Sequence, residues 1–132
     1  MSVFRPSRDK RVCKLNFDDQ FFYELPLHEN TARDIAEICD KQRKALESIQ
    51  GDDPTAFDKA YNSSLDALDE ILGEGAGADI MSIYDDPSLF DIAEVVYYIA
   101  DEFKAAYASL MNEQKAVGPN SSERRNYQRG RR

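Results

Sequence analysis

The longest helical pattern in the sequence runs from Pro87 to Met111, and it constrains the fold more than any other segment. Its apolar residues recur at spacings of three and four, which places them on one side of an α-helix. Such a stripe has to be buried against other elements. Asp86 occupies the expected N-cap position and Pro87 the first helical position. The stripe consists of Leu89, Ile92, Ala93, Val96, Ile99, Ala100, Phe103, Tyr107 and Leu110.

A β-hairpin is predicted near the N-terminus. Apolar and polar residues alternate over 12–17, and a second apolar run covers 20–25. Asp18–Asp19 between them favours a turn, and Pro26 ends the second strand. The second run does not alternate cleanly, so the sequence leaves the pairing register open.

Two further amphipathic helices are predicted between the hairpin and the long helix. The first should begin at Asn30 or Thr31 and end at Gly51, because Asn and Thr cap helices and Gly terminates them. The second should begin at Pro54 and stop at Gly73. Each has an apolar stripe at helical spacing.

A bent connection is predicted over 73–79, GEGAGAD, because three glycines disfavour a helix interior. A short helical turn around Ile80, Met81 and Ile83 should follow. The expected fold is mainly α: an antiparallel bundle of three main helices plus a short helical turn, with a small N-terminal β-hairpin.

Charge divides the chain into three parts. Residues 15–117 hold 23 Asp and Glu against 7 Lys and Arg, a net charge of -16, whereas residues 1–14 and 118–132 each carry +4. We expect a flexible basic arm over 1–11, a single helical domain over 12–117 and a disordered, arginine-rich tail over 118–132. The tail is either a solubilising segment or an interaction segment for phosphate or an acidic surface.

Several protein classes are disfavoured. No apolar run reaches membrane-spanning length and the N-terminus lacks a secretory apolar stretch, so we expect an intracellular protein without a membrane partner. Cys13 and Cys39 lack CxxC spacing and are expected to be buried, reduced thiols. His28 is the single histidine, which disfavours a zinc site or a serine nucleophile and favours a surface or capping role.

Pairs of acids at i and i+3 occur along all three predicted helices. Such pairs on adjacent helices hold Mg²⁺ in all-α nucleotide pyrophosphohydrolases, which makes that activity one alternative. The other interpretation is a solvated acidic face. The pairs are Glu37 with Asp40, Asp66 with Asp69, and Asp91 with Glu94.

Aromatic residues widen the apolar surface of the long helix. Phe90 and Tyr97 are seven residues apart, and Tyr98 follows directly. Most of this added width is expected to belong to the core, and any part that is exposed favours binding of another helix. The candidate partner-binding residues are Phe90, Tyr97, Tyr98 and Tyr107.

These features together resemble the small, acidic, mainly helical tail assembly chaperones of long-tailed bacteriophages and prophages. The resemblance rests on VCKLNFDDQFFYELPL at 12–27, LDALDEILGEGAGADI at 65–80, FDIAEVVYYIADEFKAAY at 90–107 and the NEQK that follows. It covers about residues 12–116 and explains neither the basic arm nor the tail.

The resemblance implies a non-enzymatic protein without cofactors, located in the cytoplasm of the bacterial host. Members of that family bind the tape measure protein, help recruit the tail tube protein and often have a longer form made by ribosomal frameshifting. Self-association is also expected, but not direct nucleic-acid binding by the acidic core. No individual binding residue follows from the resemblance. An acidic DNA mimic that inhibits a nucleic-acid enzyme stays an alternative, as does the pyrophosphohydrolase.

Overall fold

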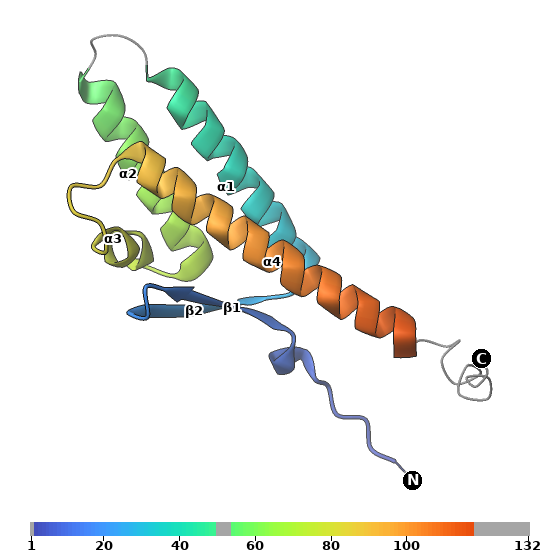
Figure 1. Cartoon of the computed structure of the whole chain (residues 1–132). Helices are drawn as coiled ribbons and strands as arrows, with labels where there is room; N and C mark the ends of the chain where they lie inside the picture. Colours follow the sequence, from blue (N-terminus) through green and yellow to red (C-terminus); the bar gives the residue numbers. More distant parts are fainter. Residues whose placement is uncertain (1, 50–53, 118–132) are drawn as a thin grey trace.

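A computed structural model describes residues 2–49 and 54–117 (Figure 1). The described part is mainly helical and has a two-stranded antiparallel sheet near its N-terminus, which confirms the expected fold class. In chain order, the elements are a 3₁₀ turn (Arg8–Lys10), β1 (Val12–Phe17), β2 (Phe21–Pro26), α1 (Glu29–Ser48), α2 (Pro54–Leu72), α3 (Ala76–Met81) and α4 (Leu89–Val117).

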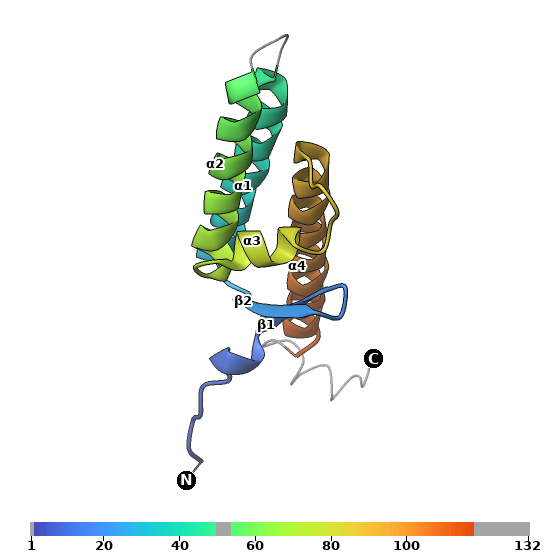
Figure 2. The same ribbon diagram turned by 90° about the vertical axis from the view of Figure 1, so that its left-hand side faces the viewer.

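The three long helices form the bundle. α1 and α2 lie side by side and antiparallel, and α4 packs mainly against α1 (Figures 1 and 2). α4 is antiparallel to α1, because Tyr107 near its end donates a hydrogen bond of 3.0 Å to Glu29 at the start of α1. The short α3 lies across one end of the bundle, with the hairpin beside it and against α4 (Figure 2).

The hairpin has the register that the sequence left open. Leu15 lies opposite Tyr23, and alternate residues of β1 are buried, so one face of the hairpin completes the core. Asp18 and Asp19 in the turn have φ angles of 57° and 56°. This left-handed conformation is tolerated better by Asp than by most residues, which is why the turn forms at this pair.

The cap of α1 differs from the expectation. The helix begins at Glu29, and Nδ1 of His28 accepts a hydrogen bond of 3.0 Å from the backbone N–H of Asn30. The capping role expected as one option for His28 is therefore confirmed, whereas the predicted start at Asn30 or Thr31 is late by one or two residues. Thr31 is instead buried against the core.

The start of α4 was also predicted too early. Asp86 has a φ of 56° and lies in the connection between α3 and α4, so it does not cap the helix. Ser88 caps it instead, because its Oγ accepts from the Phe90 N–H at 3.2 Å. The carboxylate of Asp91 accepts from the Ser88 N–H at 2.8 Å, which completes a reciprocal capping box.

The glycine-rich segment is partly helical, contrary to the expectation. α3 begins at Ala76, after Gly75 with a φ of 86°, and includes Gly77. The backbone N–H of Gly77 donates to Oδ1 of Asp69 at 2.7 Å, and a Cβ at Gly77 would lie 2.8 Å from the carbonyl oxygen of Leu65. Glycine is needed here because α3 approaches the α2 backbone closely.

The core contains one polar joint between the long helices. Gln42 of α1 is only 1% exposed, and its Nε2 donates to the carbonyl oxygen of Leu89 in α4 at 3.2 Å. Its Oε1 accepts from the hydroxyl of Ser64 in α2 at 2.8 Å. The fully buried apolar residues around the core include Leu15, Leu68, Ile80, Ile92, Val96 and Ile99.

Both ends of the chain were predicted to be irregular. Residues 2–11 form no regular element beyond the 3₁₀ turn, and Val3 and Phe4 are exposed. The Leu27 N–H donates to the Arg11 carbonyl at 2.9 Å, which ties the end of the arm to the hairpin. The flexibility of the arm stays a prediction. The tail at 118–132 and the predicted boundary at 51–53 lie outside the described residues.

Candidate functional site: an aromatic and acidic surface on α4

Two of the four predicted aromatic residues are exposed on α4. Phe90 is 76% exposed and Tyr97 49% exposed. They are two helical turns apart and therefore lie on one face. These two residues of the widened apolar surface of the long helix therefore face outward.

Tyr98 has a structural role. Its hydroxyl donates to the backbone carbonyl of Asn16 and accepts from the Asn16 N–H, both at 3.1 Å. Its ring meets the Phe17 ring edge-on, with centroids 5.2 Å apart. Tyr98 thereby satisfies the backbone N–H and carbonyl of Asn16 at the outer edge of β1, and it attaches the hairpin to α4.

Tyr107 joins the opposite end of α4 to α1. Its hydroxyl bonds to Glu29, and its ring packs at a tilt against Phe103 with centroids 5.7 Å apart. The hydrogen bond to the carboxylate, together with some burial, raises the pKa of the Tyr107 hydroxyl. The site prediction is thus divided by the geometry: Phe90 and Tyr97 face outward, whereas Tyr98 and Tyr107 make internal contacts.

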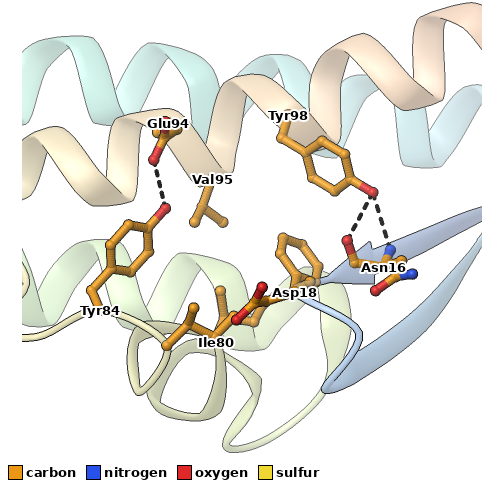
Figure 3. A pocket seen from close by; sticks show the side chains of 9 residues that line it. Asn16, Asp18, Ile80, Tyr84, Glu94, Val95 and Tyr98 are labelled. Atoms are coloured by element: carbon orange, nitrogen blue, oxygen red, sulfur yellow. Dashed lines mark hydrogen bonds between the residues drawn. The ribbon is translucent and has the colours of Figure 1, made fainter.

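An open pocket of about 420 Å³ lies against α4 (Figure 3). It is bordered by the hairpin turn, the end of α3 with the segment that connects α3 to α4, and α4 itself. Figure 3 shows Tyr84 and Tyr98 on either side of it, each attached to another element by its hydroxyl. We call this the tyrosine pocket; it is lined by Asn16, Phe17, Asp18, Ile80, Ile83, Tyr84, Glu94, Val95 and Tyr98.

The tyrosine pocket combines an apolar interior with a negative rim. Ile80 and Val95 project into it from α3 and α4 (Figure 3), and the Tyr84 hydroxyl donates to Glu94 at 2.7 Å. Burial, followed by the hydrogen bond and the charge of Glu94, raises the pKa of Tyr84. The two charged lining residues, Asp18 and Glu94, are both acidic. Such a pocket suits an apolar or aromatic group flanked by cations.

Glu94 connects the pocket to the exposed aromatics. It lies four residues after Phe90 and three before Tyr97, so the three side chains are neighbours on the surface of α4. Glu94 therefore lies next to the exposed aromatics and also lines the tyrosine pocket, and we call Phe90, Tyr97, Glu94 and the tyrosine pocket together the α4 surface.

The acid pairs expected for a hydrolase are used differently. Asp40 is held by Lys44 and Arg43, and their hydrogen bonds lower its pKa. Asp69 accepts from α3 and Asp91 caps α4. Within residues 2–49 and 54–117, no three His, Cys, Asp or Glu side chains are grouped closely enough to hold a metal ion.

The two cysteines do not form a disulfide with each other. Both cysteines are free thiols, with Cys13 buried and Cys39 partly buried, and burial raises the pKa of each. The expectation of reduced thiols agrees with this geometry, although only one is fully buried. In the described ranges, no helix is both long and apolar enough to cross a bilayer.

Sequence reasoning missed the pocket and the residue Tyr84. The lining residues come from three segments that are distant along the chain, so no local pattern reveals it. One signal was available: Tyr84 and Glu94 flank the predicted start of the long helix, where a tyrosine in the connection can reach back to the first turns.

Comparison with known proteins found no matching family model, no matching curated sequence and no matching solved structure.

Proposed function

We propose that this protein is a non-enzymatic phage tail assembly chaperone, which binds an amphipathic, basic segment of the tape measure protein in the host cytoplasm and helps recruit tail tube subunits. The observation that supports binding is the α4 surface, where two large aromatic side chains are exposed beside an apolar pocket. Exposed aromatics that adjoin a pocket are typical anchors of protein–protein interfaces.

The charge of the α4 surface specifies the chemistry of the partner. Asp18 and Glu94 border the pocket, and Asp101 and Glu102 are exposed on the next turn of α4. Each carboxylate repels an acidic partner and attracts a basic one. The expected partner segment therefore carries apolar side chains at helical spacing with Lys or Arg beside them.

This arrangement suits a chaperone for long helices. The aromatic residues would cover the apolar face of the bound segment, while the acidic surface, with net charge -16 over 15–117, would keep the complex soluble. Tape measure protein and tail tube protein are the proposed partners on the basis of the sequence resemblance.

Co-expression with the tape measure protein of the same genome tests this proposal. The wild-type chain should capture the tape measure protein. The double variant Phe90→Ser/Tyr97→Ser should bind about 30-fold more weakly, as expected when two anchors that together contribute about 2 kcal/mol are removed. Phe22→Ser is the matched control, because Phe22 is 64% exposed but lies on the hairpin. Absence of capture at both low and high salt would refute the proposal.

The same variants separate this function from DNA mimicry. A DNA mimic binds through its carboxylates, and replacing Phe90 and Tyr97 leaves the net charge unchanged. Capture of a basic nucleic-acid enzyme that is insensitive to the double variant but abolished by salt would favour the mimic.

A further inference from the structure

We infer that the N-terminal arm of one copy of this chain binds the tyrosine pocket of a second copy, with the Phe4 ring inside the pocket and the arm cations at its acidic rim. The arm, residues 2–11, and the pocket belong to different parts of the chain, so each copy offers an arm to one neighbour and a pocket to another. This contact involves copies of the free protein alone and therefore goes beyond the proposed function.

The arm carries an aromatic side chain that makes little contact with the rest of the molecule. Phe4 is 86% exposed and Val3 beside it is 68% exposed, although both belong to the described part of the chain. In both views the arm leads away from the helices and the hairpin (Figures 1 and 2). Burial of the Phe4 ring is the largest gain in apolar contact that the arm can make.

The tyrosine pocket offers the apolar surface that Phe4 lacks. Ile80 and Val95 project into the pocket, and the rings of Tyr84 and Tyr98 lie on either side of it (Figure 3). The pocket has a volume of about 420 Å³ and is open to solvent, so a phenyl ring can enter without a change in the fold. Aromatic rings in contact also stabilise each other beyond the area that they bury.

Charge complementarity favours the arm as the occupant. The arm contains four cations and one acid: Arg5, Arg8, Lys10 and Arg11 against Asp9. Within residues 2–49 and 54–117, no ion pair uses an arm cation. The pocket has the opposite charge, because its two charged lining residues are Asp18 and Glu94. A cation next to the bound ring is therefore attracted by both carboxylates.

The arm also reduces the repulsion between two copies. Residues 15–117 carry a net charge of -16, so two such domains repel each other when they approach directly. An arm that crosses from one copy to the next places positive charge at the boundary between them. Association through the arm is therefore favoured over direct contact between two acidic surfaces.

Proline limits the conformations that the arm gives up on binding. Pro6 has a fixed φ, and Arg5 before it is restricted to extended backbone. Residues 2–7 form neither helix nor strand in the structure. A segment restricted in this way loses less conformational entropy when it binds.

The arm is too short for the pocket of its own molecule as long as its 3₁₀ turn is retained. The arm joins β1 at Val12, whereas the pocket adjoins Asp18 beyond the other end of that strand. These two residues are about 20 Å apart at about 3.3 Å per residue. The Leu27 N–H holds the Arg11 carbonyl beside the hairpin at 2.9 Å. Residues 4–7, which precede the turn, span only about 13 Å.

The resulting contact is head-to-tail, because an arm and a pocket are different surfaces. Such contacts close into a ring or continue as an open chain of copies. A partner that binds the tyrosine pocket has to displace the arm, so partner binding and self-association should oppose each other.

Sedimentation of the purified full chain tests the contact. The average mass of the wild type should rise over about a hundredfold range of concentration, as mass action requires. Phe4→Ser should weaken association about 30-fold, the effect expected for the loss of one anchor. Phe22→Ser, which removes an exposed aromatic residue from the hairpin, should leave association unchanged. A wild type that stays monomeric, or equal effects of the two variants, would overturn the assignment.

Two charge variants localise the pocket side. Glu94→Lys should weaken association, whereas Glu113→Lys, exposed near the other end of α4, should preserve it although it changes the net charge equally. Asp18→Asn is a second pocket variant that retains the turn, because Asn also tolerates a positive φ, and it should weaken association partially. Equal effects of the Glu94 and Glu113 variants would show non-specific attraction and contradict the pocket assignment.

Mixing two defective variants provides the sharpest test. The Phe4→Ser chain keeps an intact pocket, and the Glu94→Lys chain keeps an intact arm. At a concentration where each variant alone is monomeric, the mixture should form a heterodimer through the one intact arm and the one intact pocket. A mixture that stays monomeric would exclude the head-to-tail contact.

A fluorescent arm distinguishes a neighbour's pocket from the pocket of the same molecule. The sequence has no tryptophan, so Phe4→Trp reports the arm alone and keeps an aromatic anchor. Its emission should shift to the blue as concentration rises. A blue shift that does not depend on concentration, or exposed emission throughout, would overturn the contact between copies. These measurements need no partner, so their failure is distinct from a failure to capture the tape measure protein.

Discussion

Gln42 connects three helices through side-chain hydrogen bonds, and its replacement tests how the bundle is held together. Gln42→Ala removes the bond to Leu89 and the bond to Ser64. Each buried hydrogen bond contributes about 1 kcal/mol. The buried Cγ methylene that the substitution removes contributes about 1 kcal/mol in addition, because a partial cavity replaces it and the amide group. We expect a loss of about 3 kcal/mol, which corresponds to a fall in Tm of about 12 °C for a domain of this size.

Gln42→Leu is the informative comparison. It retains most of the side-chain volume, and the Ser64 hydroxyl, whose one hydrogen is shared between Gln42 Oε1 and the carbonyl oxygen of Ala60, both at 2.8 Å, can then donate entirely to Ala60. Its cost should therefore be about 1 kcal/mol. A double-mutant cycle with Ser64→Ala should show coupling of about 1 kcal/mol with Gln42.

Urea denaturation followed by circular dichroism measures these free energies of unfolding. If Gln42→Leu is as destabilising as Gln42→Ala, Gln42 stabilises the bundle through its hydrogen bonds alone. The contribution assigned to its buried side-chain volume would then be wrong. If Gln42→Ala costs less than about 0.5 kcal/mol, the joint between the helices does not support the bundle.

Three further predictions concern α3, the hairpin and Tyr84. Gly77→Ala should destabilise the fold by about 1–3 kcal/mol, because its Cβ would meet the α2 backbone. Ala78→Gly, at the exposed neighbouring position, should cost about 1 kcal/mol, because glycine disfavours a helix. Thermal denaturation measures both costs. No loss of stability in Gly77→Ala would show that α3 does not pack closely. Tyr98→Phe should cost about 0.5–1.5 kcal/mol and increase amide hydrogen exchange at Asn16, where unchanged exchange would disprove the contact. The raised pKa of Tyr84 means that the unfolded chain releases this proton at a lower pH than the folded chain, so the free energy of unfolding should fall as pH rises above about 10. Tyr84→Phe should reduce the slope of the free energy of unfolding against pH, measured by urea titrations at alkaline pH. An unchanged slope would contradict the assignment.

The long helix and the order of elements were predictable because their signals are local. The stripe from Leu89 to Phe103 is buried at the expected positions except Ala100, which is partly buried, since helical spacing determines which side chains share a face. Val95 is also buried, although it lies outside that stripe. It faces the hairpin and α3, which cover a second side of α4.

Polar residues in the core were not predicted. Gln42 lies seven residues after Ile35 and four after Ile38, so it belongs to the buried stripe of α1 by position. Its polarity caused it to be omitted, because a glutamine is buried only when specific partners satisfy it. Those partners are on α2 and α4, and a pattern within one helix does not reveal them.

The candidate site was predicted in part for the same reason. Helical spacing places Phe90 and Tyr97 on one face, but their exposure and the internal roles of Tyr98 and Tyr107 depend on which elements pack beside α4. The tyrosine pocket requires the hairpin turn, α3 and α4 to meet, so it arises only from the tertiary structure.

Site-specific photo-crosslinking tests the central claim most directly. A photoreactive phenylalanine analogue placed at position 90 or 97 reports which protein lies against the α4 surface, and the same analogue at position 22 reports an equally accessible part of the hairpin. In cells that also produce the tape measure protein, we expect crosslinks to it from positions 90 and 97 and none from position 22. Crosslinks from position 22 alone, or none to the tape measure protein from any of the three positions, would contradict the proposed function.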